Sequence, residues 1–298
     1  MSGTSALIHG VSRRRKVTDR VATVVIAVCF IAALIPLVSL LWTVVSRGMA
    51  RMDPTFFTSS MRGIVGDGGG AIHAITGTVL VTGAAVVISV PIGVGTAVYL
   101  VEYGRGAIPR LIRFLTDVMT GIPSIVAGLF AYALIVILVG PGARSGIAGA
   151  AALSLLMIPV VVKSSEEMLL LVPDDLREAS TALGAPKYKT VTTVVLPTAM
   201  SGIVAGVMLG ICRIIGETAP LLLVAGFTDS MNRDLFSGRM ATLPVYIYSQ
   251  WQNKGADQAA YDNRAWSAAL VLIVLVLICN LASRVVAHAL SPRTYPTH

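Results

Sequence analysis

The chain has 298 residues, of which 55% are hydrophobic and only 13% are charged, and its formal net charge is +8. Soluble domains usually carry about 25% charged residues, so this composition indicates an integral membrane protein. The basic residues are scattered between apolar runs rather than gathered in a stripe, which argues against nucleic-acid binding. Cys29, Cys212 and Cys279 are far apart and form no CxxC pair, so neither a disulfide framework nor a metal site is predicted.

Six apolar runs are long enough to cross a membrane, because a spanning helix needs about 20 mostly apolar residues. We therefore predict an all-α membrane protein with a cytoplasmic tail over residues 1–20 and one membrane domain over 21–298. The first run is too long for a signal peptide and no A-x-A site follows it, so we expect it to be retained. The predicted spans are 21–45, 74–101, 114–139, 146–165, 190–225 and 266–288.

Prolines and glycines interrupt several of these spans. Proline removes a backbone donor and clashes with the preceding turn, so weak points are expected in the second, third and fourth spans, at Pro91, Pro123 and Pro159. The fifth run is longer than one crossing requires, and we expect it to break or bend near its ends, where it contains Pro197, Gly216 and Pro220. Irregular backbone at membrane depth is tolerated only where protein buries it or where it lines a cavity.

Lysine and arginine are more numerous on one side of the predicted spans. That side holds the dense cluster at residues 13–20 and most of the basic residues between 102 and 189. The positive-inside rule therefore places both termini and the segment 166–189 in the cytoplasm. The segments 46–73 and 226–265 are expected to be exterior loops.

The cytoplasmic segment is expected to contain a short helix over residues 173–183. Pro173 suits the first helical position, and Asp174 and Asp175 then complement the helix dipole in the first turn. Gly184 follows where a left-handed residue would end the helix.

One face of this short helix is apolar. Leu176, Ala179 and Leu183 share it, while Arg177 and Glu178 lie off it. A helix of about three turns is marginal in water and needs a surface to pack on. That surface is either a soluble partner protein, or the helix's own bundle or the lipid headgroups; the residues alone leave both readings open.

Small residues recur every four positions in the fifth span, at Gly202, Gly206 and Gly210. Such spacing gives a helix a smooth face that lets another backbone approach closely. A neighbouring helix of the same bundle and a helix of a partner permease fit this pattern equally well.

The fifth span also carries Arg213 and Glu217, which four-residue spacing would place on one helix face. Each central charge costs about 2.5–3.5 kcal/mol on insertion scales, and pairing would offset part of that cost. One reading is a self-neutralising pair that fixes helix rotation. The other is that Arg213 contacts an oxyanion, because its planar fork of donors fits phosphate oxygens, while Glu217 holds Arg213 in one of two gating positions.

Several motifs resemble known transport proteins. Glu178-Ala179-Ser180, then Gly184 and Leu196-Pro197, resembles the EAA loop of ABC-importer permeases, with Ser180 in place of the usual second alanine. From about residue 75 onward the chain resembles the phosphate-importer permeases, and the PstA type more than the PstC type. The runs that carry this likeness are 90–93, 99–103, 121–128, 213–221 and 241–248.

The resemblance implies a type I ABC importer permease with about six transmembrane helices in the bacterial inner membrane. A PstC-like second permease would complete a heterodimer, two PstB-like ATPase subunits would dock on the cytoplasmic loops, and a PstS-like binding protein would deliver phosphate. Glu178, Ala179 and Gly184 become coupling residues, with Leu176 and Leu183 as apolar contacts. The chain itself is expected to be non-catalytic and to bind no cofactor, with ATP bound by its partners.

Energetics agree with an external source of power. Moving negative charge into a negatively polarised cytoplasm costs about 2.3 kcal/mol per charge per 100 mV. The sequence has no G-x-x-x-x-G-K-[ST] loop, and the glycine cluster at 66–70 lacks the lysine, so the chain cannot use ATP alone.

Three alternatives remain at this point. The first is a permease for another oxyanion, such as sulfate or molybdate, because ATPase docking is indifferent to cargo. The second is an ion-coupled secondary transporter, although no convincing internal repeat is found. An intramembrane enzyme is disfavoured, since neither H-E-x-x-H nor G-x-S-x-G occurs.

Overall fold

The computed structural model describes residues 13–140, 142–255 and 257–290. Two compact units divide the chain, residues 1–47 and residues 48–298. The described residues of the first unit, 13–47, belong to α1 (Arg13–Gly48), a 36-residue helix with Pro36 inside it. Residues 13–20, which the sequence assigned to a tail, form the first turns of α1; residues 1–12 lie outside the described part.

Helices also make up the second unit, with short 3₁₀ and π turns between some of them. The elements are η1 (Met49–Arg51), α2 (Pro54–Thr58), α3 (Ile72–Val98), η2 (Tyr99–Tyr103), α4 (Ala107–Gly121), α5 (Ser124–Val139), α6 (Gly146–Leu170), α7 (Asp174–Ala182), α8 (Lys187–Thr190), η3 (Val191–Val195), α9 (Leu196–Ile215), α10 (Ala219–Val224), α11 (Leu243–Gln252) and α12 (Gln258–Leu290).

The predicted number of spans is confirmed. Within the described residues, five helices are long and apolar enough to cross a membrane, and α4 with α5 gives a sixth if the bent pair counts as one span. The third span is not straight, because the chain bends by 110° between α4 and α5, around Pro123. The fifth is broken as expected, since α9 ends at Ile215 and α10 begins at Ala219.

Pro91 and Pro159 behave differently from Pro123. Both lie inside helices that continue past them, α3 and α6, so the weak points expected there do not interrupt the spans. A proline inside a membrane helix costs one backbone hydrogen bond, and surrounding helices can compensate for it. Pro123 instead follows Ile122, whose backbone is extended, and the chain turns there.

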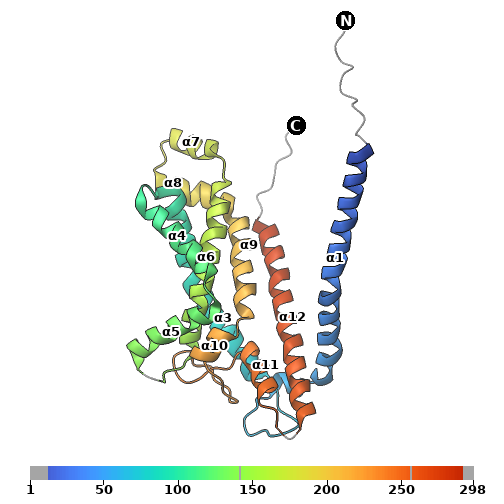
Figure 1. Ribbon diagram of the computed structural model, residues 1–298. Coiled ribbons are helices and arrows are strands. Elements are labelled where there is room, and N and C mark those ends of the chain that lie inside the picture. Colours follow the sequence, from blue (N-terminus) through green and yellow to red (C-terminus); the bar gives the residue numbers. More distant parts are fainter. Residues whose placement is uncertain (1–12, 141, 256, 291–298) are drawn as a thin grey trace. The chain divides into compact units, whose positions relative to one another are not determined.

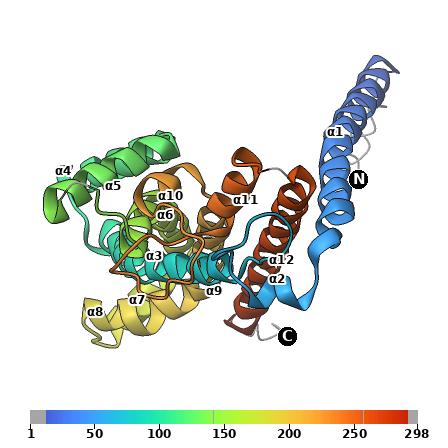
Figure 2. The ribbon, with the colours of Figure 1, turned by 90° about the horizontal axis from the view of Figure 1, so that it is seen from below.

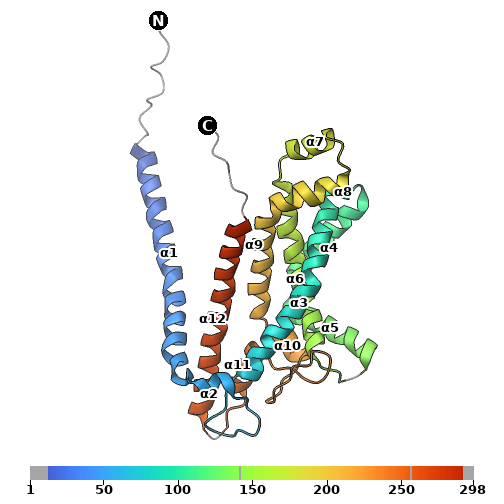
Figure 3. The same ribbon diagram turned by 180° about the vertical axis from the view of Figure 1, so that it is seen from behind.

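Within the second unit, α7 lies at one end and α2 and α11 lie at the other (Figures 1 and 3). Helix α12 runs from the α11 end toward the α7 end. Viewed along the bundle in Figure 2, α6 is central, and it packs against α3, α9, α5 and α10. The main core lies at these contacts and includes Val81, Leu153, Met157, Ile214 and Leu221.

Glycines let α6 approach its neighbours closely. A Cβ at position 93 of α3 would lie only 2.6 Å from Val161 Cγ1 in α6. The stripe Gly202, Gly206 and Gly210 of α9 also faces α6, where an added Cβ at position 206 would overlap the Ser164 side chain. The neighbour of this stripe is therefore a helix of the same chain.

Two arginines hold the glycine-rich loop at the α11 end of the bundle. Arg264 of α12 is fully buried and donates to Gln250 Oε1 at 2.8 Å, to the Gly66 carbonyl at 2.5 Å and to the Gly68 carbonyl at 3.2 Å. Arg51 donates to the Gly68 and Gly69 carbonyls at 3.4 and 3.0 Å. Carbonyl oxygens and a buried guanidinium are both costly to leave unpaired, so these hydrogen bonds stabilise the loop.

We predict that Arg264→Met releases this loop, because the substitution keeps much of the volume but leaves the Gly66 carbonyl without its donor, at about 1–3 kcal/mol, and the Gly68 carbonyl with only the longer bond from Arg51. Limited proteolysis of detergent-solubilised protein should cut residues 59–71 faster. Arg62→Met, an exposed change in the same segment, is the matched control and should leave cleavage unchanged. Equal cleavage of the Arg264 variant and the parent protein would contradict the assignment.

Candidate functional site

The two broken spans meet in the folded chain. Helix α5, which follows the bend at Pro123, packs against α10, which follows the break at Gly216. At their crossing, a Cβ at Gly128 would lie 2.6 Å from Pro220 Cα and 2.9 Å from Pro220 Cβ. Two motifs far apart in sequence, 121–128 and 213–221, therefore form one structural site.

Local chemistry explains each break. Pro123 cannot continue α4, and its carbonyl instead accepts from the Val126 and Ala127 amides in the first turn of α5. Thr218 likewise precedes α10, and its carbonyl accepts from the Leu222 amide. Pro220 near the start of α10 loses nothing by lacking an N–H, because the first amides of a helix have no intrahelical acceptor.

Arg213 and Glu217 are not arranged as the sequence suggested. Arg213 lies in the last turn of α9 with an exposed side chain, but α9 ends at Ile215, before Glu217 is reached. The Glu217 amide donates to the Ile214 carbonyl in a tight turn, so helical spacing does not place the two side chains on one face. Across the described residues neither side chain forms an ion pair. The expected shared face is therefore wrong.

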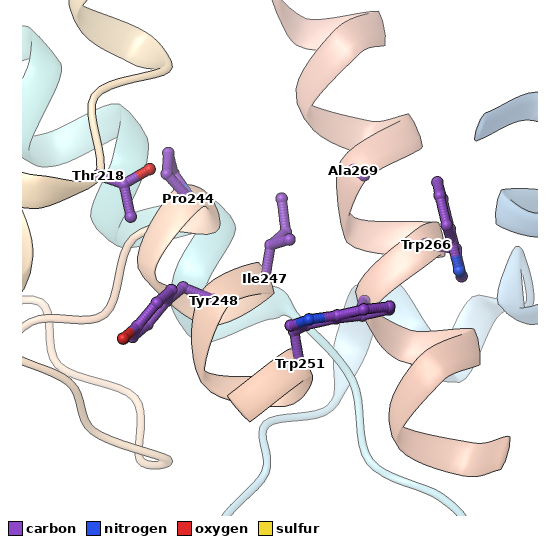
Figure 4. A pocket seen from close by; sticks show the side chains of 8 residues that line it. Thr218, Pro244, Ile247, Tyr248, Trp251, Trp266 and Ala269 are labelled. Carbon is purple, nitrogen blue, oxygen red and sulfur yellow. The ribbon is translucent and has the colours of Figure 1, made fainter. Parts of the chain in front are cut away.

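An apolar pocket of about 440 Å³ lies beside the same break, between α11 and α12 (Figure 4). Thr218 reaches its edge, and Figure 4 shows the rings of Tyr248, Trp251 and Trp266 around it. Neither Arg213 nor Glu217 lines it, and its walls offer no charge to an anion. The complete lining is Thr218, Pro244, Ile247, Tyr248, Trp251, Ala265, Trp266 and Ala269.

Helix α7 has the ends that the sequence predicts to within one residue. Pro173 precedes its first residue instead of being that residue. At the other end Gly184 has φ +79°, the Gly184 amide donates to the Thr181 carbonyl at 2.9 Å, and the Ala185 amide donates to the Ser180 carbonyl at 3.2 Å. This pair of bonds is a Schellman motif, which requires a left-handed residue and therefore favours glycine.

The apolar face of α7 is open. Leu176 is 40% and Leu183 is 89% exposed, Ala179 and Glu178 are exposed as well, and α7 has no buried residue. A helix in this state has not found its packing partner within the described chain. The structure therefore shows no packing of this face on the chain's own bundle, which was one of the surfaces that the sequence left open.

Sequence reasoning missed how α7 is held. Arg177, on another face of α7, donates to Glu102 Oε1 in η2 at 3.0 Å and to the Leu169 and Val172 carbonyls at 2.9 and 2.6 Å. The sequence gives no signal for this role of Glu102. Its run, 99–103, belongs to the motifs that carry the resemblance, but no local pattern links it to a residue of a different loop.

We predict that the contact between α5 and α10 tolerates no side chain at position 128. Gly128→Ala puts a methyl group against backbone, which cannot give way as a flexible side chain could; overpacking of this kind costs about 1–3 kcal/mol, or roughly 3–10 °C in melting temperature. Thermal unfolding in detergent measures it. Gly121→Ala is the matched control from the same motif, because nothing lies within 4 Å of its added Cβ. If both variants unfolded at the parent temperature, the close contact would be refuted.

Comparison with known proteins agrees with this architecture. Residues 89–295 match the family model of the binding-protein-dependent transport system inner membrane component. The chain is 48% identical to the phosphate transport system permease protein PstA 1 of Mycobacterium tuberculosis H37Rv, covering 92% of this chain and 88% of that protein. It is 38% identical to PstA of Yersinia pestis, covering 92% and 90%.

Solved structures share the fold at low sequence identity. A chain of a bacterial alginate ABC transporter, in complex with its alginate-bound periplasmic protein, matches with a TM-score of 0.65 at 12% identity, over 92% of this chain and 96% of that one. A chain of the inward-facing MetNI methionine ABC transporter matches with a TM-score of 0.58 at 20% identity, over 80% and 100%. The chain therefore belongs to the binding-protein-dependent transport permeases and has the type I ABC importer permease fold.

Proposed function

We propose that this chain is the transmembrane permease subunit of an ATP-driven inorganic phosphate importer. The observation that carries this proposal is its similarity to phosphate permeases, 48% identical over nine-tenths of both chains. Uptake of labelled phosphate into proteoliposomes that hold the assembled importer tests it. Competition by sulfate or molybdate that exceeds competition by phosphate would favour the alternative cargo, and uptake without any ATPase subunit would favour a secondary transporter.

The proposal includes partners that the chain needs. The exposed face of Leu176, Ala179 and Leu183 suits an apolar groove of a cytoplasmic ATPase, two copies of which would serve a heterodimer with a PstC-like permease. A PstS-like protein would deliver phosphate at the opposite end, where α11 lies. The chain would be a non-catalytic subunit of the bacterial inner membrane with both termini in the cytoplasm, as its distribution of basic residues favours.

Arg213 is the residue that we propose to meet the anion. Its guanidinium stays charged at any relevant pH, and no carboxylate of the described chain neutralises it. It lies at the end of α9, where a cation is favoured by the helix dipole and where the span breaks. Glu217, just beyond the break, would repel a phosphate dianion and is proposed to act in gating.

Arg213→Ala should reduce phosphate uptake at least tenfold, because a charge-assisted contact with the moving anion contributes about 1.5–3 kcal/mol. Co-purification with the ATPase should be unchanged. Arg233→Ala removes another exposed arginine, in the loop after α10, and should leave uptake within twofold. Normal uptake by the Arg213 variant would remove this residue from the pathway.

Glu178→Lys should uncouple the importer, because it reverses a charge on the exposed helix that we propose to be the docking site. We expect phosphate uptake to fall more than tenfold and stimulation of ATP hydrolysis to be lost, with the permease still inserted in the membrane. Asp19→Lys, the same charge reversal in α1, controls for the change in net charge. Unaltered uptake and ATPase assembly would disprove docking through α7.

A further inference from the structure

Helix α7 is held in place by hydrogen bonds and an ion pair, not by apolar packing. It has no buried residue, so little hydrophobic free energy fixes its orientation. Its firm connection is on the face that carries Arg177, away from the exposed Leu183. A helix attached in this way can receive a partner on one side and pass on its displacement through the other.

The centre of the attachment is Glu102, whose side chain is only 7% exposed. It lies in η2, a π turn that continues directly from α3. Its Oε1 accepts from Arg177 Nε at 3.0 Å, so a buried carboxylate of the α3 end is paired with a guanidinium of α7. Separating such a pair would leave an uncompensated buried charge, which is strongly unfavourable.

The same arginine also reaches the end of α6. Its Nη2 donates to the Leu169 carbonyl at 2.9 Å and its Nη1 to the Val172 carbonyl at 2.6 Å. The last carbonyls of a helix have no intrahelical partner, and a cation there satisfies them. Arg177 therefore ties α7 to α3 and α6 at once.

A residue of α8, beyond α7, also contacts Glu102, at its main chain. Lys187 Nζ donates to the Glu102 main-chain carbonyl and lies 5.1 Å from the centre of the Tyr103 ring. A third tie joins α7 to α8, where the Ser180 and Thr190 hydroxyls lie 2.8 Å apart. Ser180 is the position at which the chain departs from the usual alanine, and its hydroxyl makes this bond possible.

We infer that Glu102 is the positioning residue through which movement of α7 is transmitted to α3. This inference rests on the proposed function, in which an ATPase docks on the open face of α7. Helix α7, through Arg177, and α8, through Lys187, both bond Glu102, the first at its carboxylate and the second at its main-chain carbonyl. Helix α3 in turn packs along α6 at the centre of the bundle. The acid acts through α7 and α3, without contact with the transported anion.

The test uses the assembled importer in proteoliposomes and measures phosphate taken up per ATP hydrolysed. Glu102→Gln keeps the shape of the side chain but removes its charge. We expect the ratio to fall about tenfold, the size of a lost charge-assisted hydrogen bond, while the ATPase still co-purifies. A role in folding alone would lower the amount of importer and leave this ratio unchanged.

Asp174→Asn is the matched control. Asp174 bonds the same guanidinium, to Nη1 at 2.9 Å, but its side chain is 85% exposed, so the ratio should stay within twofold of the parent value. If Glu102→Gln fails to insert, Arg177→Gln removes the other partner, and the same fall is expected.

A parent-like ratio in whichever of these variants assembles would overturn the inference and leave the proposed function intact. Failure of the unmodified importer to hydrolyse ATP and take up phosphate would instead overturn the proposed function, and this inference with it.

Discussion

In hydrocarbon an unpaired backbone amide or carbonyl finds no water, so a membrane span can break only where protein covers the break. Two spans of this chain break, at Pro123 and at Gly216. The helices that follow these breaks, α5 and α10, pack against each other. Gly128 and Pro220 approach so closely that a single methyl group would not fit between them. Arg213 lies just before the second break, in the last turn of α9.

The attachment of α7 obeys a different rule. Outside the hydrocarbon, water competes for every polar group, and a short helix gains little from packing. Arg177 escapes this competition because Glu102 is buried and because its guanidinium also donates to the Leu169 and Val172 carbonyls at the end of α6. The bundle is thus joined by close glycine contacts in its middle and by charge at its α7 end.

Much of the fold could be predicted from sequence because its signals are local. Span number, the interruption at Gly216 and the left-handed Gly184 each depend on a few neighbouring residues. Pro91, Pro123 and Pro159 have the same local chemistry, yet only Pro123 turns the chain, because surrounding helices decide whether a missing hydrogen bond is compensated. Periodicity also assumed that α9 continued to Glu217, and its early end separated that acid from the face of Arg213.

The tie between Glu102 and Arg177 was beyond sequence reasoning for another reason. The two residues belong to different loops, and each has an ordinary local explanation, one as a turn residue and the other as a polar position on a helix. Only the return of α6 beside α3 brings them together. The same holds for Gly128 and Pro220, whose motifs could be recognised separately without any sign that they touch.

The two guanidinium groups that grip the glycine-rich loop also affect how another molecule would engage that end of the protein. Glycine is the residue with the most conformational freedom to lose, and here Arg51 and Arg264 have already removed much of it during folding. A molecule settling over this loop therefore meets a preorganised surface and avoids most of the entropic penalty of ordering it.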